Sequence, residues 1–276
     1  MPRRKSLARW GSFGLMCVIV IAIDLPIITL ILNSFRGTAE ILSATTIIPT
    51  SPSLVNYAYV SQRTSFFQYL RNSLIMAGGG MAVSIVAATL AGYALSRFRS
   101  PFLGVYTRGL FLIQMFPLIL ALIPLFILFR TLGLVNTYFS VLILYTVIQL
   151  PFGTSMFRAF FNGIPRDLEE AAYIDGASRI QAFGLVVLPL AAPAVAAVAI
   201  FAFLFSYNEY LIALIFLRSQ DLYTVPLGVQ QFMQQYGTDW GSLMAAATMA
   251  MLPTFVLFLL IQKYMAYGAI GSGVKG

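Results

Sequence analysis

The chain has 276 residues, of which 59% are hydrophobic and 9% are charged. A globular domain carries about 25% charged residues, so a chain with so few cannot cover a water-soluble surface of this size. The composition therefore excludes a soluble or secreted protein. It predicts an all-α protein that crosses the membrane several times.

The charged residues give a formal net charge of +8, and they lie scattered between apolar segments. This arrangement matches the positive-inside bias of membrane proteins better than nucleic-acid binding, so we expect membrane lipid around the chain and no nucleic acid. The sequence has no histidine and a single cysteine, Cys17. His-ligated metal sites, Ser-His catalysis and an intrachain disulfide are therefore excluded, and no metal site is expected.

Six apolar segments are each long enough to cross about 30 Å of hydrocarbon as a helix. They lie at residues 11–32, 70–95, 106–129, 138–161, 190–217 and 241–262. The first continues into bulky residues instead of a small-residue cleavage site, so we expect a retained helix and not a signal peptide. The spans form one membrane domain at residues 11–267, between a basic head at 1–10 and a tail at 268–276.

The distribution of basic residues predicts the orientation of the chain. With the N-terminus in the cytoplasm, 12 of the 17 Lys and Arg residues lie in cytoplasmic segments and 5 lie outside. This split favours cytoplasmic N- and C-termini. The polar segment between the fourth and fifth spans is then cytoplasmic as well.

The second span is rich in small residues, including the run Gly78, Gly79 and Gly80. Such a run resembles a phosphate loop, but no Lys-Ser or Lys-Thr pair follows it. Small residues let helix backbones approach closely in lipid, so we interpret these glycines as packing residues.

Two acidic residues, Asp24 and Glu209, lie inside predicted spans. A charge at the bilayer centre costs about 2.5–3.5 kcal/mol on insertion scales, so such residues usually face a cavity or a partner. Gln114 and Gln149 are further polar candidates for a substrate path. Prolines in the third, fourth and sixth spans fit a helix beside a cavity and equally fit ordinary kinks.

Four of the nine acidic residues lie in the polar segment that follows the fourth span: Asp167, Glu169, Glu170 and Asp175. The segment predicts two short helices. Pro165 suits a first helical position, and carboxylates favour the positive start of a helix. Gly176 is placed to end the first helix, and Ser178 with Gln181 forms a capping box for the second.

Each of these two helices is also predicted to have one apolar face. The first face is formed by Ile164, Leu168, Ala171 and Ala172, and the second by Ile180, Phe183, Val187 and Leu188. Caps and apolar faces in this arrangement indicate a compact helical knob on the membrane surface, and they do not fit a solvated loop.

The knob carries a motif that resembles the EAA loop of ABC-importer permeases, E-A-A-x3-G-x9-I-x-L-P. The matching residues are Glu170, Ala171, Ala172, Gly176, Leu188 and Pro189, with Val186 in place of Ile. Further stretches are similar to carbohydrate-importer permeases of the maltose-permease type: NSL at 72–74, AGYALSRFRSP at 91–101, MFP at 115–117, YIDGAS at 173–178, SYNEYLIAL at 206–214 and the terminal GSGVKG. The resemblance covers nearly the whole chain.

The resemblance implies a type I ABC-importer permease fold of six transmembrane helices in the bacterial inner membrane, with a cytoplasmic EAA coupling helix in the loop at 163–189. It implies that the ATPase-coupling residues are Glu170, Ala171, Ala172, Asp175, Gly176, Leu188 and Pro189. It places a second ATPase contact in the tail, at Gly273, Val274, Lys275 and Gly276. Asn208, Glu209 and Tyr210 match a motif that lines a cavity in the family, although a structural role for Glu209 remains an equal alternative.

The sequence lacks the phosphate loop G-x-x-x-x-G-K-[ST] that ATP hydrolysis requires, so we expect no enzyme activity and no cofactor bound by this chain. The resemblance implies that ATP and Mg are bound by a partner ATPase dimer. It also implies a second homologous permease subunit, which would form a heterodimer with this chain, and an extracytoplasmic sugar-binding protein.

The expected function is ATP-driven, binding-protein-dependent import of a sugar or sugar derivative. One alternative is an ABC permease for a non-sugar solute. Another is a stand-alone secondary transporter, which does not explain the knob. The sequence does not identify the sugar, the subunit that holds it or the role of Asp24.

Overall fold

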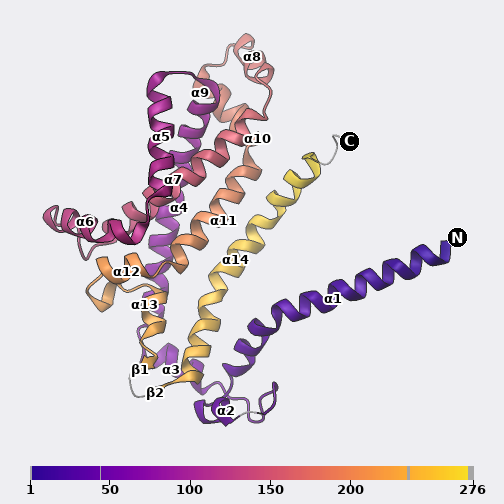
Figure 1. Ribbon diagram of the computed structural model, residues 1–276, viewed down its shortest axis with the longest axis vertical. Coiled ribbons are helices and arrows are strands. Elements are labelled where there is room, and N and C mark those ends of the chain that lie inside the picture. The colour runs from indigo at the N-terminus through magenta and orange to yellow at the C-terminus, as the bar shows by residue number, and fades with distance from the viewer. Residues whose placement is uncertain (1, 44, 235–236, 273–276) are drawn as a thin grey trace. The chain divides into compact units, whose positions relative to one another are not determined.

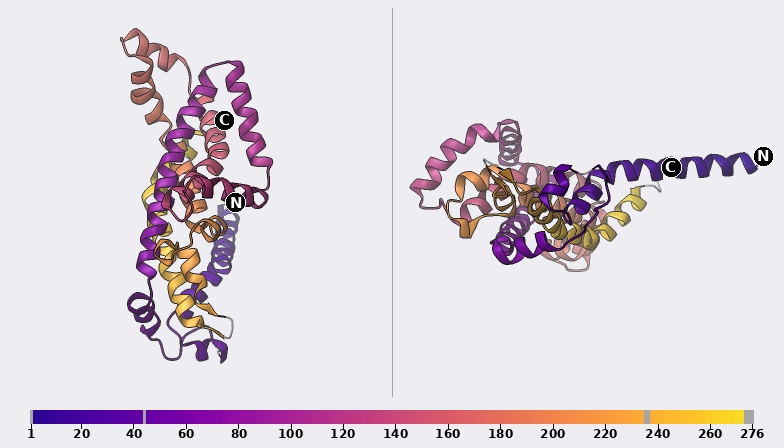
Figure 2. Two further views of the ribbon diagram at one scale, coloured as in Figure 1. Left: turned by 90° about the vertical axis from the view of Figure 1, so that its left-hand side faces the viewer. Right: turned by 90° about the horizontal axis from the view of Figure 1, so that it is seen from below.

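The computed structural model describes residues 2–43, 45–234 and 237–272, and the side chains of 12–43, 45–233 and 237–264. The described chain forms helices and one short antiparallel strand pair (Figures 1 and 2). It divides into two compact units. The first contains residues up to Phe66 together with Val229–Leu252, and the second contains Phe67–Gly228 and the chain from Pro253 onward.

The first unit begins with α1 (Pro2–Asn33), whose helix includes the basic head. The unit continues through α2 (Thr38–Ser43), α3 (Val55–Arg63), β1 (Met233–Gln234), β2 (Gly237–Thr238) and the first part of α14 (Trp240–Ser272). None of the side chains in the apolar window of Ser12–Asn33 is buried. A helix of this length and exposure suits the hydrocarbon of a bilayer, as expected for the first span.

Hydrogen bonds to backbone groups hold the turns of the first unit. Asn56 Nδ2 donates to the carbonyls of Ser34 and Arg36, at 2.8 and 2.7 Å. Asp239 caps α14, since its carboxylate accepts from Thr38 Oγ1 at 2.9 Å and from the Ser242 amide at 3.2 Å. Burial raises the pKa of Asp239, but the hydrogen bonds from Ser242 and Thr38 outweigh burial and the pKa is lowered.

The second unit contains the helices around which the candidate site is built. They are α4 (Phe66–Arg97), α5 (Pro101–Met115), α6 (Leu118–Thr131), α7 (Tyr138–Asn162), α8 (Asp167–Ile174), α9 (Arg179–Ala182), a π-helical turn (Phe183–Val187), α10 (Leu188–Leu190), α11 (Ala192–Asn208), α12 (Leu211–Phe216) and a 3-10 turn (Gln220–Leu222). Next comes α13 (Val225–Gln230), of which the part up to Gly228 belongs to this unit. The first residue of α4, Phe66, still belongs to the first unit. Helix α7 packs against α5, α11 and α12.

The third predicted span, 106–129, is wrong as one straight helix. Helix α5 ends at Met115, α6 begins at Leu118, and the two helices meet at an angle of 107°. The break lies at Pro117, which cannot donate a backbone hydrogen bond and which holds the preceding Phe116 in an extended conformation (φ −81°, ψ 127°).

The fifth predicted span, 190–217, is also interrupted. Its helical part is α11, which is bent by 73° from the Arg179–Leu190 segment and ends at Asn208. Glu209 is then extended (φ −71°, ψ 128°), and a separate helix, α12, begins at Leu211. No proline causes this second break. The Glu209 carboxylate accepts the amide hydrogens of Ile212 and Ala213, and these bonds stabilise a new helix start.

Within the described residues, four helices are long and apolar enough to cross a membrane, and the number rises to six if each bent pair counts as one span. The four are in α1, α4, α7 and α14. The prediction of an all-α protein that crosses the membrane several times is therefore confirmed, and the predicted number of six is reached when each bent pair is one crossing.

Small residues bring α4 and α7 into close contact, as the sequence predicts. A Cβ placed on Gly92 would lie 2.6 Å from Cβ of Phe157 and 3.0 Å from the backbone nitrogen of Arg158. Gly80 likewise approaches Tyr145 of α7. Gly78 differs, because a Cβ there would meet no atom within 4 Å, so packing does not explain this glycine.

We expect Gly92→Ala to lower the stability of the protein, because the added methyl group would overlap Phe157 and the backbone of α7. Overpacking of this kind costs about 1–3 kcal/mol. The thermal-unfolding midpoint of the purified protein in detergent measures the effect. Gly78→Ala on the same helix is the matched control and should not lower the midpoint, because its Cβ meets no atom and alanine favours a helix more than glycine does. Equal midpoints for both variants would contradict the close packing at Gly92.

Candidate functional site

The first candidate site is a helical knob at residues 166–190, which follows α7 at one end of the second unit (Figure 1). Helix α8 carries three carboxylates in its first turn and has its C-cap at Asp175. Gly176 follows with φ +87°, a conformation that glycine adopts without strain. The capping box of Ser178 and Gln181 is present at the start of α9. The predicted pair of helices, the turn at Gly176 and the capping box are therefore confirmed. The predicted helix start at Pro165 is wrong, because α8 begins at Asp167 and its N-cap, Arg166, makes no side-chain capping bond.

The predicted apolar faces of the knob are partly wrong. Val187 is fully buried and Ile164 is nearly so, but Leu168 is exposed and Ile180 is 83% exposed. Ile174 is exposed as well, at 87%. The reason is that the second unit supplies little cover for these two short helices. Their large apolar side chains therefore form a bare surface, which is typical of a site that binds another protein.

The knob is fastened to α4 by a buried ion pair that the sequence analysis missed. Glu169 is 4% exposed, and its Oε1 accepts from Arg97 Nε at 2.5 Å. Its Oε2 accepts from the Tyr93 hydroxyl at 2.6 Å. Arg97 also donates to the carbonyls of Phe161 and Ile164, at 2.9 and 3.1 Å. One guanidinium thus joins α4, the end of α7 and the start of the knob.

A second set of bonds surrounds this ion pair. Ser96 Oγ donates to Asn162 Oδ1 at 2.8 Å, and Arg97 Nη1 donates to Ser96 Oγ at 3.0 Å. Arg166, just before α8, donates to the Ser96 carbonyl at 3.2 Å. The sequence signal for this contact was the stretch AGYALSRFRSP, but Arg97 and Glu169 are 72 positions apart, so their pairing is visible only in the folded chain.

The predicted coupling residues all lie at the surface of the knob. Glu170, Ala171, Asp175, Gly176 and Pro189 are exposed, whereas Ala172 and Leu188 are half-buried. The two adjacent glutamates of α8 therefore differ: Glu169 faces inward to Arg97, and Glu170 faces outward. The predicted tail contact, Gly273–Gly276, lies outside the described residues.

The second candidate site is a polar cluster between α7 and the α11–α12 break. Gln149 Nε2 donates to Ser206 Oγ at 2.7 Å, and Gln149 Oε1 is buried without a partner. The Tyr145 hydroxyl donates to Glu209 Oε2 at 3.4 Å. The structure thus brings two predicted path residues, Gln149 and Glu209, to one seam between helices. Glu209 also caps α12, so it has a structural role there.

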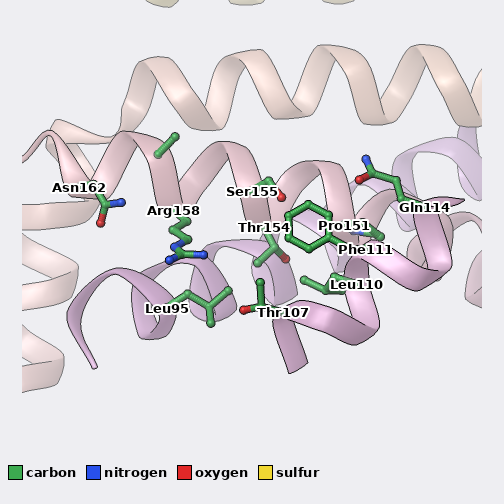
Figure 3. Close-up of a pocket in the computed structure, with 11 residues that line it drawn as sticks. Leu95, Thr107, Leu110, Phe111, Gln114, Pro151, Thr154, Ser155, Arg158 and Asn162 are labelled. Atoms are coloured by element: carbon green, nitrogen blue, oxygen red, sulfur yellow. The ribbon is translucent and has the colours of Figure 1, made fainter. Parts of the chain in front are cut away.

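The other predicted path residues lie elsewhere. Asn208 is exposed and donates to the Leu204 carbonyl of its own helix, and Tyr210 is half-buried. Asp24 belongs to the exposed helix α1 of the first unit. Gln114 lines a separate cavity of about 250 Å³ between α5 and α7 (Figure 3). The six residues therefore do not form one cluster.

The overall fold is that of a membrane chain of an ABC importer. It matches a solved bacterial ABC transporter that imports the acidic polysaccharide alginate, with a TM-score of 0.81 over 95% of this chain and 98% of that chain. At 22% identity, this match supports the fold alone.

The chain belongs to the family described as binding-protein-dependent transport system inner membrane component, whose model matches residues 80–268. It is 34% identical to the sulfoquinovosyl glycerol transport system permease protein SmoH of Agrobacterium fabrum, over 91% of this chain and 88% of the relative. It is 35% identical to the trehalose/maltose transport system permease protein MalG of Thermococcus litoralis, over 91% of each chain. The expected resemblance to sugar-importer permeases is confirmed.

We expect Glu169→Ala to loosen the knob, because it leaves the Arg97 guanidinium buried without its carboxylate. Removing one partner of a buried ion pair costs about 3–5 kcal/mol. Limited trypsin digestion checks this, since Arg166 and Arg179 are cleavage sites within the knob. Cleavage there should become faster in Glu169→Ala and in Arg97→Gln. Glu170→Ala, at the exposed residue next to Glu169, is the control, and its digestion should match that of the unchanged protein. Faster cleavage in all three variants would refute a specific role for the Arg97–Glu169 pair.

Proposed function

We propose that this chain is one of two membrane subunits of an ATP-driven importer, and that its knob is the coupling surface for an ATPase dimer. The observation that carries the proposal is the outward face of α8. Exposed Glu170 lies there with two alanines and exposed apolar side chains. On the inner face, Glu169 forms an ion pair with Arg97. Exposed apolar side chains of this kind are unfavourable on a helix that faces only water, whereas a helix that docks to another protein buries them in the interface.

The energy source follows from what the sequence lacks. Without a phosphate loop, the chain depends on a partner that binds ATP and Mg. A groove on that partner receives the knob, with Glu170 paired to a basic group and Ala171 and Ala172 allowing close approach. Asp175, Gly176, Leu188 and Pro189 complete the surface. The tail residues, Gly273 to Gly276, provide a second contact with the ATPase.

Motion of the docked knob reaches the membrane through the Arg97–Glu169 pair. Because Arg97 also bonds the Phe161 and Ile164 carbonyls, a rotation of α8 pulls on the ends of both α4 and α7. Helix α7 carries Tyr145 and Gln149 to the seam with α11. Rotation of the knob thereby moves the helix that carries part of the polar cluster. Alternating access requires such a coupled movement of helices.

The proposed orientation places both termini and the knob in the cytoplasm of a bacterial cell. The 12 to 5 distribution of basic residues supports this arrangement. A second homologous permease completes the path as a heterodimer with this chain. A binding protein on the opposite side of the membrane delivers the solute, in keeping with the description of the family.

The proposed solute is a sugar or sugar derivative, because two relatives of similar length are named for the transport of sulfoquinovosyl glycerol and of trehalose and maltose. Gln149 and Glu209 supply hydrogen-bond groups of the kind that sugar hydroxyls require. Asn208, Tyr210 and Gln114 are additional candidates, and Asp24 is a more distant one in the chain. A non-sugar solute would preserve the coupling surface, so it remains the alternative that the transport test decides.

Proteoliposomes that contain this chain with its partner permease and ATPase test the function. We expect uptake of a radiolabelled sugar only when ATP is inside and the binding protein is outside. Amino acids and peptides presented with their own binding proteins should not enter. Uptake that proceeds without the ATPase would identify a stand-alone transporter, and uptake of a non-sugar would overturn the solute class.

We expect Glu170→Arg to weaken ATPase binding at least about tenfold, because placing like charges together at an interface costs several kcal/mol. Co-purification of the ATPase from mild detergent, with titration of the free subunit, measures the loss. Asp221→Arg makes the same charge change at an exposed position outside the knob and should leave ATPase binding intact. Unchanged retention in Glu170→Arg would exclude this face of α8 as the docking surface.

A further inference from the structure

Two adjoining cavities at the knob end of the second unit are lined by arginines that the coupling surface does not use. One, of about 430 Å³, lies between the α4–α5 link and the end of α7, and includes Arg99, Arg158 and Arg166. The other, of about 250 Å³, lies between α5 and α7. Both are lined by Leu95, Thr107, Arg158 and Asn162, so they are neighbours, and we call the two cavities together the depression.

The larger cavity is strongly cationic. No carboxylate lines it, and the side chains of Arg99 and Arg158 make no hydrogen bond or ion pair within the described part of the chain. The amino end of α5 also borders this cavity, since Ser100 is the N-cap of that 15-residue helix. Unpaired guanidinium groups beside a helix start attract an anion, and guanidinium geometry suits phosphate oxygens.

The smaller cavity has a different character. Leu95, Leu110 and Phe111 form the apolar part of its lining, and Gln114 and Ser155 are among its polar residues. Thr154 lies in its wall and is fully buried, with a hydroxyl that has no partner in the described chain. Figure 3 shows Thr154 and Arg158 extending from α7 on the side where Thr107 of α5 lies. An occupant that fills both cavities therefore needs an anionic group next to an apolar portion.

We propose that this depression binds a phosphate group, and that the group is the headgroup of an anionic phospholipid. Arg99, Arg158 and Arg166 contact the phosphate oxygens. The first part of the lipid tail lies along Leu95 and Phe111. Free phosphate would satisfy the arginines but would leave the apolar cavity unfilled. Basic pockets between membrane helices on the cytoplasmic side bind lipid headgroups by this chemistry.

The bound phosphate would stabilise the base of the knob. Arg99 lies in the link between α4 and α5, Arg158 belongs to α7, and Arg166 precedes α8. An anion shared by the three holds these segments together and offsets their mutual repulsion. The location of this site on the cytoplasmic side of the membrane, and any effect of the lipid on transport, rest on the proposed function. Binding of the lipid does not.

Native mass spectrometry of the full chain with its partners, titrated with phosphatidylglycerol or phosphatidylcholine, tests the proposal. We expect phosphatidylglycerol to bind more tightly, and each of Arg99→Gln and Arg158→Gln to weaken it on the order of fivefold. Arg108→Gln is the matched control, because Arg108 is exposed on α5 next to Thr107 but lines neither cavity. Its affinity for phosphatidylglycerol should equal that of the unchanged protein.

Three outcomes would overturn the proposal of a lipid site. Equal loss in Arg108→Gln would show general surface attraction, and equal binding of the two lipids would exclude an anion site. Competition by inorganic phosphate at the same concentration as the lipid would assign the site to a free anion. Retention of the partner subunits by each variant confirms that it is folded. Tight phosphatidylglycerol binding in a complex that imports no sugar would refute the proposed function alone.

Discussion

The pairing of Arg97 with Glu169 is the interaction on which the functional half of the structure depends. A buried ion pair offers little net stability by itself, because desolvation of the two charges offsets their attraction. Its value lies in geometry, since the same guanidinium also bonds two carbonyls at the end of α7. The knob is therefore held in one orientation, with Glu170 on its exposed outer face.

The knob was largely predictable from local chemistry. Caps act within a few residues, so the box at Ser178 and the turn at Gly176 could be identified from spacing alone. The apolar faces were less predictable, because helical periodicity shows which residues share a face and not what covers it. Leu168 and Ile180 follow the pattern, and both are exposed.

Contacts between distant segments set the limit of the sequence analysis. The ion pair joins residues 72 positions apart, and nothing in the neighbourhood of Glu169 separates it from Glu170. The polar path illustrates the same limit. Gln149 and Glu209 meet at one seam, whereas Gln114 lines another cavity and Asp24 lies on α1. Hydropathy found the crossings but did not reveal that two of them are bent.

The bend at Pro117 has a consequence for how the chain lies among its neighbours. Pro117 cannot donate to the carbonyl of Ile113, and hydrocarbon offers that oxygen no substitute. The bend must therefore be sheltered by water or by protein, and lipid tails alone cannot surround it. The corner between α5 and α6 thus marks a part of the second unit that bulk lipid alone cannot surround.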